Sequence, residues 1–164
     1  MAMWSRVWKW HAALLCLLFV MTNILQLNDS ASGIVVALWI PGFASIIFVM
    51  WHFRFRKGVP LTPIEKQLGQ VWMMFVVTAI LTGAINHLMH LDTLKLLPLV
   101  VLECGLAFCC MAAILGGSFY PIGIACFAVA VIMTIAPTIG PAIFGVSFAI
   151  GLLVPSLKFS RAAR

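Results

Sequence analysis

Glu103 is the residue best placed to do chemistry, because it is the only acidic residue inside a long apolar stretch, residues 93–115. A charged side chain at the centre of a membrane helix costs about 2.5–3.5 kcal/mol on insertion scales, so it is normally paired, protonated or turned toward a cavity. Its carboxyl group is therefore either a site for a proton or a cation, or half of a hydrogen bond that packs two helices, worth about 1 kcal/mol. Because the apolar segments hold no second acidic residue, we favour the packing interpretation.

Polar residues recur at every fourth position of the preceding apolar segment, at Thr78, Thr82, Asn86 and His90. In a helix this spacing makes a slowly winding polar stripe on one face. If the two segments fold back on each other around Asp92, Glu103 lies level with residues 79–83. We therefore predict a hydrogen bond from Glu103 toward Thr82 or Thr78. The candidate intramembrane polar site consists of Glu103, Thr78, Thr82 and Asn86.

His87 and His90 are weak candidates for metal ligands, with Asp92 close in sequence and with Met89 of a type that suits copper. No motif supplies a further ligand from another segment, so we predict neither a metal nor another cofactor. The cysteines lie in apolar stretches without C-x-x-C spacing, so we interpret them as small core residues. They are Cys16, Cys104, Cys109, Cys110 and Cys126.

The composition indicates that a membrane surrounds these residues. Of 164 residues, 64% are hydrophobic and 9% are charged, whereas a soluble domain is about half apolar and about a quarter charged. There is too little polar surface to cover a water-soluble globule. The net charge of +6 is spread over short connecting segments, as membrane topology requires, and is not clustered as nucleic-acid binding requires.

Long apolar runs in a bilayer must be helices of about 20 residues. We predict an all-α polytopic bundle, a single domain over residues 1–164. Residues 62–65 form a capping box with proline at the first helical position, and breakers at 116–118 and 137–141 divide the uncharged C-terminal part. The six predicted spans are residues 10–27, 32–53, 67–90, 93–115, 119–136 and 141–157.

The basic residues test this count. With six spans, nine of them share one side, and only Lys95 lies on the other. This bias places both termini in the cytoplasm. A secretory signal at the start is the less favoured reading, because no clear A-x-A cleavage site follows. The nine are Arg6, Lys9, Arg54, Arg56, Lys57, Lys66, Lys158, Arg161 and Arg164.

Several short segments carry a resemblance to a known family. The segments are LTPIEKQLGQVW at residues 61–72, GGSFY at 116–120, FG at 144–145 and VPSLKF at 154–159. From about Trp39 onward the chain resembles the C-terminal multi-pass membrane region of planctomycete-type bacterial serine/threonine protein kinases. The kinase motifs themselves are absent from this sequence, so the resemblance implies a membrane module for anchoring or sensing and transfers no catalytic residue.

We therefore expect a non-catalytic, signalling-associated protein of the bacterial cytoplasmic (inner) membrane that anchors, scaffolds or senses for a partner protein or a larger membrane complex. Its cytoplasmic contacts would be Arg54, Arg56 and Lys57, which suit anionic lipid or a protein. The alternative is a small proton- or cation-coupled transporter built around Glu103. An enzyme would need a nucleophile–base pair or a metal triad, and the sequence shows neither. Nucleic acid is not an expected partner, and a homo-oligomer is left open.

Overall fold

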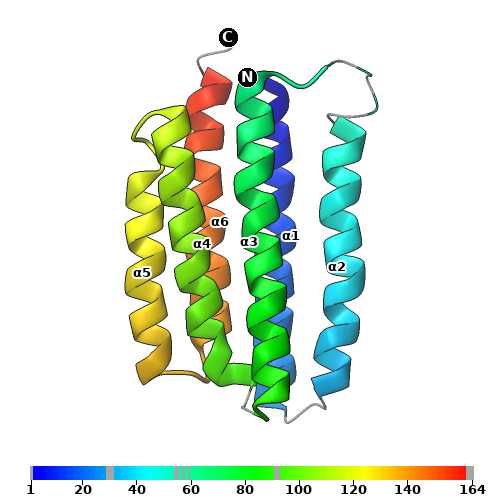
Figure 1. Cartoon of the computed structure of the whole chain (residues 1–164), viewed down its shortest axis with the longest axis vertical. Helices are drawn as coiled ribbons and strands as arrows, with labels where there is room; N and C mark the ends of the chain where they lie inside the picture. The colour runs from blue at the N-terminus through cyan, green and yellow to red at the C-terminus, as the bar shows by residue number, and fades with distance from the viewer. Residues whose placement is uncertain are drawn as a thin grey trace. The chain divides into compact units, whose positions relative to one another are not determined.

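The computed structural model describes residues 2–28, 32–53, 56, 58, 60–90 and 93–161. Within these ranges the chain forms six α-helices and no strand, which confirms the all-helical prediction (Figure 1). The helices are α1 (Ala2–Leu27), α2 (Ser32–Phe53), α3 (Pro63–Leu88), α4 (Thr93–Leu115), α5 (Tyr120–Ile135) and α6 (Gly140–Arg161).

The predicted capping box starts α3. The Thr62 backbone N–H donates to Oε2 of Glu65 at 2.9 Å, and the Glu65 N–H donates to Oγ1 of Thr62 at 3.3 Å. Pro63 is the first helical residue. At this position an N–H has no hydrogen-bond partner within the helix, so proline's lack of an N–H costs nothing. The capping box therefore marks the N-terminus of α3, as predicted.

The predicted breakers also coincide with helix ends, with Gly140 and Pro141 as the first residues of α6. Helix α4 ends at Leu115, and Gly116 follows with φ +78°, a left-handed conformation that favours glycine. Helix α5 ends at Ile135, and the Gly140 N–H donates to the Pro137 carbonyl at 3.3 Å in the turn before α6. The connection from α4 to α5 is short, and these two helices run antiparallel.

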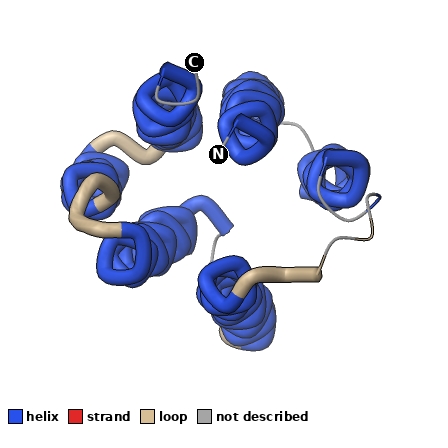
Figure 2. The backbone as a smooth tube through the Cα atoms, turned by 90° about the horizontal axis from the view of Figure 1, so that it is seen from above, coloured by secondary structure: helices blue, strands red, loops and turns tan. Residues whose placement is uncertain are grey.

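The helices group into two compact units. The first unit, Met1–Pro60 with Pro141–Arg164, contains α1, α2 and nearly all of α6; the second unit, Leu61–Gly140, contains α3, α4 and α5. Figure 2 shows α1 between α2 and α6 in the first unit, and α4 between α3 and α5 in the second. In each unit the neighbouring helices alternate in direction (Figure 1).

Small residues let α1 contact both of its neighbours in the first unit. A Cβ added at Gly42 of α2 would lie 2.6 Å from Cδ1 of Leu18, and one added at Gly145 of α6 would lie 2.6 Å from Cβ of Phe19. The Phe19 ring meets the Phe144 ring edge-on, with centroids 4.7 Å apart. The sequence pairs Gly145 with Ala149 at small-xxx-small spacing, and this face of α6 is buried.

Aromatic rings fill the core of the second unit around Phe108 of α4. The Phe108 side chain is fully buried. It meets Trp72 of α3 edge-on at 5.5 Å and stacks on Phe119 at 6.4 Å. Phe108 thus joins α3, α4 and the start of α5 near one end of the unit.

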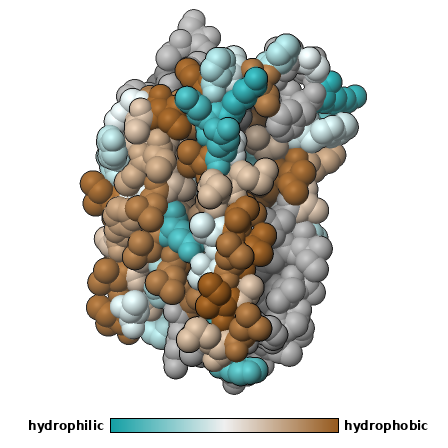
Figure 3. All heavy atoms as spheres, in the orientation of Figure 1, coloured by the Kyte–Doolittle hydropathy of each residue, from teal (hydrophilic) through white to brown (hydrophobic). Residues whose placement is uncertain are grey.

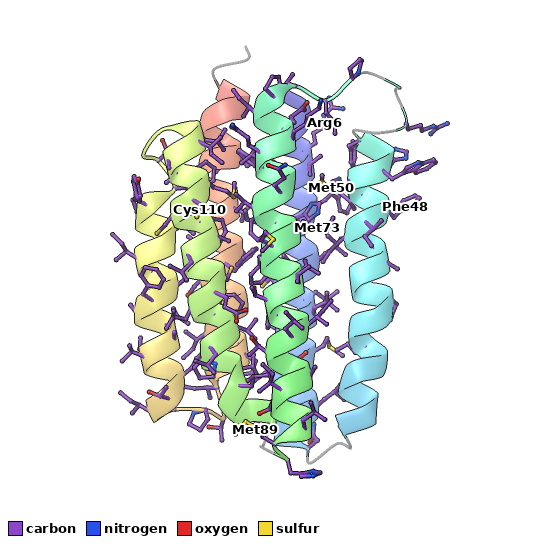
Figure 4. The ribbon with its side chains drawn as sticks, viewed as in Figure 1. Arg6, Phe48, Met50, Met73, Met89 and Cys110 are labelled. Atoms are coloured by element: carbon purple, nitrogen blue, oxygen red, sulfur yellow. The ribbon has the colours of Figure 1, made fainter. Side chains whose placement is uncertain are left out.

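Large apolar side chains also cover the outside of the helices (Figure 3). Phe48, for example, points away from α2, and Met73 is exposed on α3 (Figure 4). Among the described residues, three helical stretches are long and apolar enough to cross a membrane: Arg6–Leu25, Pro63–Asn86 and Leu96–Leu115. Shorter apolar stretches lie in the other three helices. Both helices that carry the predicted polar site, α3 and α4, have a stretch of sufficient length.

Candidate intramembrane polar site

The Glu103 side chain of α4 is hydrogen-bonded to α3. Thr82 Oγ1 donates to Glu103 Oε1 at 2.7 Å, a short distance that is typical of a hydroxyl bound to a carboxyl oxygen. The predicted contact is confirmed, including its depth opposite residues 79–83. The antiparallel turn between α3 and α4 is what brings residues 21 positions apart in the chain to the same level.

Thr78 does not share this bond. Its hydroxyl donates to the Phe75 carbonyl of its own helix at 3.0 Å, a local bond that is common for threonine in helices. Of the two partners that the sequence left open for Glu103, the structure therefore selects Thr82.

The second carboxyl oxygen of Glu103 is the unusual atom of the site. Oε2 is shielded from solvent, and no described residue gives it a hydrogen bond. Buried polar atoms are normally partnered, so an exception needs a physical explanation such as an unseen ion or proton. Glu103 thus offers one satisfied and one unsatisfied oxygen at the contact of α3 and α4.

Asn86 and His90 continue the stripe toward the end of α3. The Asn86 side chain is buried, with 6% of its surface exposed, one turn beyond Thr82. His90 lies in the turn after the helix, with an exposed side chain and a positive φ of 53°. The stripe therefore runs from a buried carboxyl group to an exposed turn.

No described cation lies beside Glu103. Lys66 precedes Thr82 by 16 positions, which is roughly 24 Å along a helix at 1.5 Å per residue. His90 follows Thr82 by eight positions, or roughly 12 Å on the same scale. On α4 itself, the position of Lys95 precedes Glu103 by eight residues, again roughly 12 Å along the helix. None of these three positions is level with the Glu103 carboxyl group.

The cysteine prediction is confirmed for two residues and wrong for one. Cys104 and Cys126 are buried core residues whose side chains hydrogen-bond across the α4–α5 contact. Cys110 is exposed instead (Figure 4), because it lies on the outer face of α4. All five cysteines are free thiols.

Helices α4 and α5 approach closely beside this pair of thiols. A Cβ added at Gly123 would lie 2.6 Å from Cys109 Sγ and 2.9 Å from the Gly105 carbonyl oxygen. Gly105 and Cys109 stand at small-xxx-small spacing on α4, a pattern typical of close helix packing. Gly123 on α5 has no small residue four positions away, so the α5 side of the contact has no such pattern.

The other predicted contact residues are described only in part. Arg56 is exposed, whereas Arg54, Lys57 and Asp92 lie outside the described residues, as does the side chain of His87. In the described part of the chain, no three histidine, cysteine or acidic residues are grouped so that they could hold a metal ion.

Comparison with known proteins assigns no family to this arrangement. No protein-family model matches the chain, and neither a curated protein nor a solved structure matches it significantly.

Proposed function

We propose that this chain is a six-span protein of the bacterial cytoplasmic membrane, with both termini in the cytoplasm, and that it anchors, scaffolds or senses for a partner protein without catalysis of its own. The observation that carries the membrane part is the apolar outer surface of the helices. Large apolar residues are exposed on all six helices. Such a surface suits lipid, since soluble monomers rarely expose contiguous apolar patches above a few hundred Å².

The positions of the basic residues support the proposed orientation. In the first unit, Arg6 and Lys9 lie near the start of α1, at the same end as the last turns of α6 with Lys158 and Arg161. In the second unit, Lys66 lies at the start of α3, and the position of Lys95 is at the opposite end, at the start of α4. In the first unit lysine and arginine are in excess at one end, which agrees with a cytoplasmic location of that end, whereas the second unit has one lysine at each end.

The exposed basic connection between α2 and α3 supports a cytoplasmic partner. Arg56 is exposed there, and the sequence places Arg54 and Lys57 beside it. The resemblance to kinase-linked membrane regions points to the same kind of role, a module that holds or informs another protein.

Native mass spectrometry of the chain, extracted gently from its own membrane, tests this proposal. We expect a stoichiometric protein partner that is lost when Arg54, Arg56 and Lys57 are changed together to glutamine. The matched control is Lys95→Gln, on the proposed opposite side, which should keep the partner. A bare monomer or homo-oligomer in the wild-type sample would contradict the scaffold role.

A second candidate function is proton- or cation-coupled transport, and the unpartnered Oε2 of Glu103 favours it. A coupling site needs a group that gains and loses a ligand inside the membrane. In that case Glu103→Gln abolishes flux in proteoliposomes while the fold is retained. If flux is absent from the wild-type protein, or if it is unchanged in Glu103→Gln, the transport candidate fails.

A further inference from the structure

We infer that the ligand of the Glu103 site is a proton, carried on Oε2, and not a metal cation, with Thr82 as the residue that positions the carboxyl group. This inference rests on the proposed membrane location of α3 and α4. It concerns a binding site, and it does not require that the protein transports anything.

The two carboxyl oxygens differ in a way that fits a neutral acid. Oε1 accepts the Thr82 hydroxyl at 2.7 Å, whereas Oε2 is shielded and has no donor among the described residues. An ionised carboxylate would share its charge with Oε2, where nothing stabilises it, and burying an unpaired charge is costly. A proton on Oε2 removes the charge and makes Oε1 the carbonyl oxygen, which is the better acceptor for the Thr82 hydroxyl.

The set of oxygen donors is too small for a hard metal cation. Calcium takes about six to eight oxygen ligands, and magnesium needs a near-octahedral set. The site offers the Glu103 carboxyl group and the Thr82 hydroxyl. The Thr78 hydroxyl is bound to the Phe75 carbonyl, and no cluster of three ligating side chains occurs in the described residues.

No described group on the neighbouring helices replaces the proton with a fixed positive charge. On α3 the charged groups, Glu65 and Lys66, lie in the first turn, far from Thr82, and His90 lies in the turn beyond the helix. On α4, the position of Lys95 lies eight residues before Glu103, roughly 12 Å along the helix. The nearby titratable groups of α4 and α5 are thiols, and Cys104 is hydrogen-bonded to Cys126. The phenol of Tyr120 is exposed at the start of α5. A proton is the smallest ligand that neutralises Glu103 in these surroundings.

Infrared spectroscopy of the full chain in liposomes tests this inference at neutral pH. We expect the carbonyl stretching band of a protonated carboxylic acid, sensitive to deuterium exchange, that is lost in Glu103→Gln. The matched control is Glu65→Gln, which removes the exposed carboxyl group of the capping box and should keep the band. In Thr82→Val the band should shift to higher frequency, because the hydrogen bond to the carbonyl oxygen is gone.

Two results would overturn this inference. The first is a carboxylate band that disappears in Glu103→Gln, which would show that Glu103 is ionised. The second is a change in the spectrum when sodium or calcium ions are added at constant pH, which would show that the site binds a metal cation. A measurement on the wild-type chain covers the case in which Glu103→Gln does not fold. Dicyclohexylcarbodiimide reacts with protonated carboxyl groups in apolar surroundings, so mass spectrometry should find Glu103 labelled. An unlabelled Glu103 overturns the inference. All measurements use the fraction that floats with the liposomes, so failure to float counts against the membrane proposal alone.

Discussion

At the scale of single residues, the contrast between Thr82 and Thr78 gives a direct test of the α3–α4 contact. Thr82→Val removes the only described donor to Glu103, and interhelical hydrogen bonds in membranes contribute about 0.6 kcal/mol on average and at most about 1.7 kcal/mol. Because Oε1 is then left without a donor, we expect a loss of about 1–2 kcal/mol in the free energy of unfolding. Reversible unfolding in mixed micelles measures this loss.

Thr78→Val is the matched control, because the Thr78 hydroxyl bonds only to the Phe75 carbonyl within α3. We expect its free energy of unfolding to stay within about 0.5 kcal/mol of the wild type, as for most substitutions away from special contacts. Equal losses in the two variants would show that the Thr82–Glu103 bond contributes nothing specific.

The sequence predicted the level of Glu103 correctly and narrowed its partner to Thr82 or Thr78, but it could not choose between the two. Antiparallel pairing around a short turn fixes the level of a residue, whereas Thr78 and Thr82 differ by only one turn of α3, roughly 6 Å. The local bond of Thr78 to Phe75 decided between them. The prediction that Cys110 is a core residue was wrong for a related reason. Apolar residues occur both on the exposed faces of these helices and in the core, so the composition of a helix does not show which face a given residue occupies.

At the scale of elements, the capping box at the start of α3 predicts a local effect. Thr62→Ala removes the acceptor of the Glu65 N–H, and such caps contribute about 0.5–2 kcal/mol. We expect faster hydrogen exchange at the Glu65 amide and a smaller free energy of unfolding. Thr134→Ala is the control, because its hydroxyl only bonds back to the Val131 carbonyl within α5. Unchanged exchange at Glu65 would argue against the cap.

Packing between α4 and α5 predicts a second effect at this scale. Gly123→Ala adds a Cβ that would lie only 2.6 Å from Cys109 Sγ and 2.9 Å from the Gly105 carbonyl oxygen, closer than van der Waals contact allows. Overpacking of this kind costs typically about 1–3 kcal/mol, and we expect that loss in mixed-micelle unfolding. Gly83→Ala on α3 has no such neighbour within 4 Å and should be neutral or slightly stabilising. A neutral Gly123→Ala would contradict the close approach.

Helix boundaries were more predictable than helix partners. Caps and breakers act within a few residues, so the segments at 62–65, 116–118 and 137–141 carry their own signal, and the structure confirms them. A contact such as Gly105 with Gly123 joins two helices, and neither sequence segment alone contains it. The division into two units could not be predicted for the same reason, because it depends on which helices pack together.

At the scale of the whole molecule, the number of spans decides where the C-terminus lies. Three described stretches meet the length and composition of a membrane span, and an odd number of spans would place the two termini on opposite sides. The shortest helix, α5, has 16 residues and is about 24 Å long, less than a hydrocarbon core of about 30 Å. A short span of this kind is accommodated by local thinning of the bilayer at modest cost, so we keep six spans in the proposal.

Reporter fusions distinguish six spans from three. A green fluorescent protein, which folds only in the cytoplasm, should fluoresce when fused after Arg164 and when fused after Gly58. Alkaline phosphatase, which is active only outside, should be active when fused after His90 and inactive after Gly58. If only the stretches in α1, α3 and α4 cross and the N-terminus is cytoplasmic, Gly58 and Arg164 would both lie outside, so both fluorescent-protein fusions would be dark and the phosphatase fused after Gly58 would be active. In that case Lys158 and Arg161 would lie outside, against the charge rule that supports the orientation.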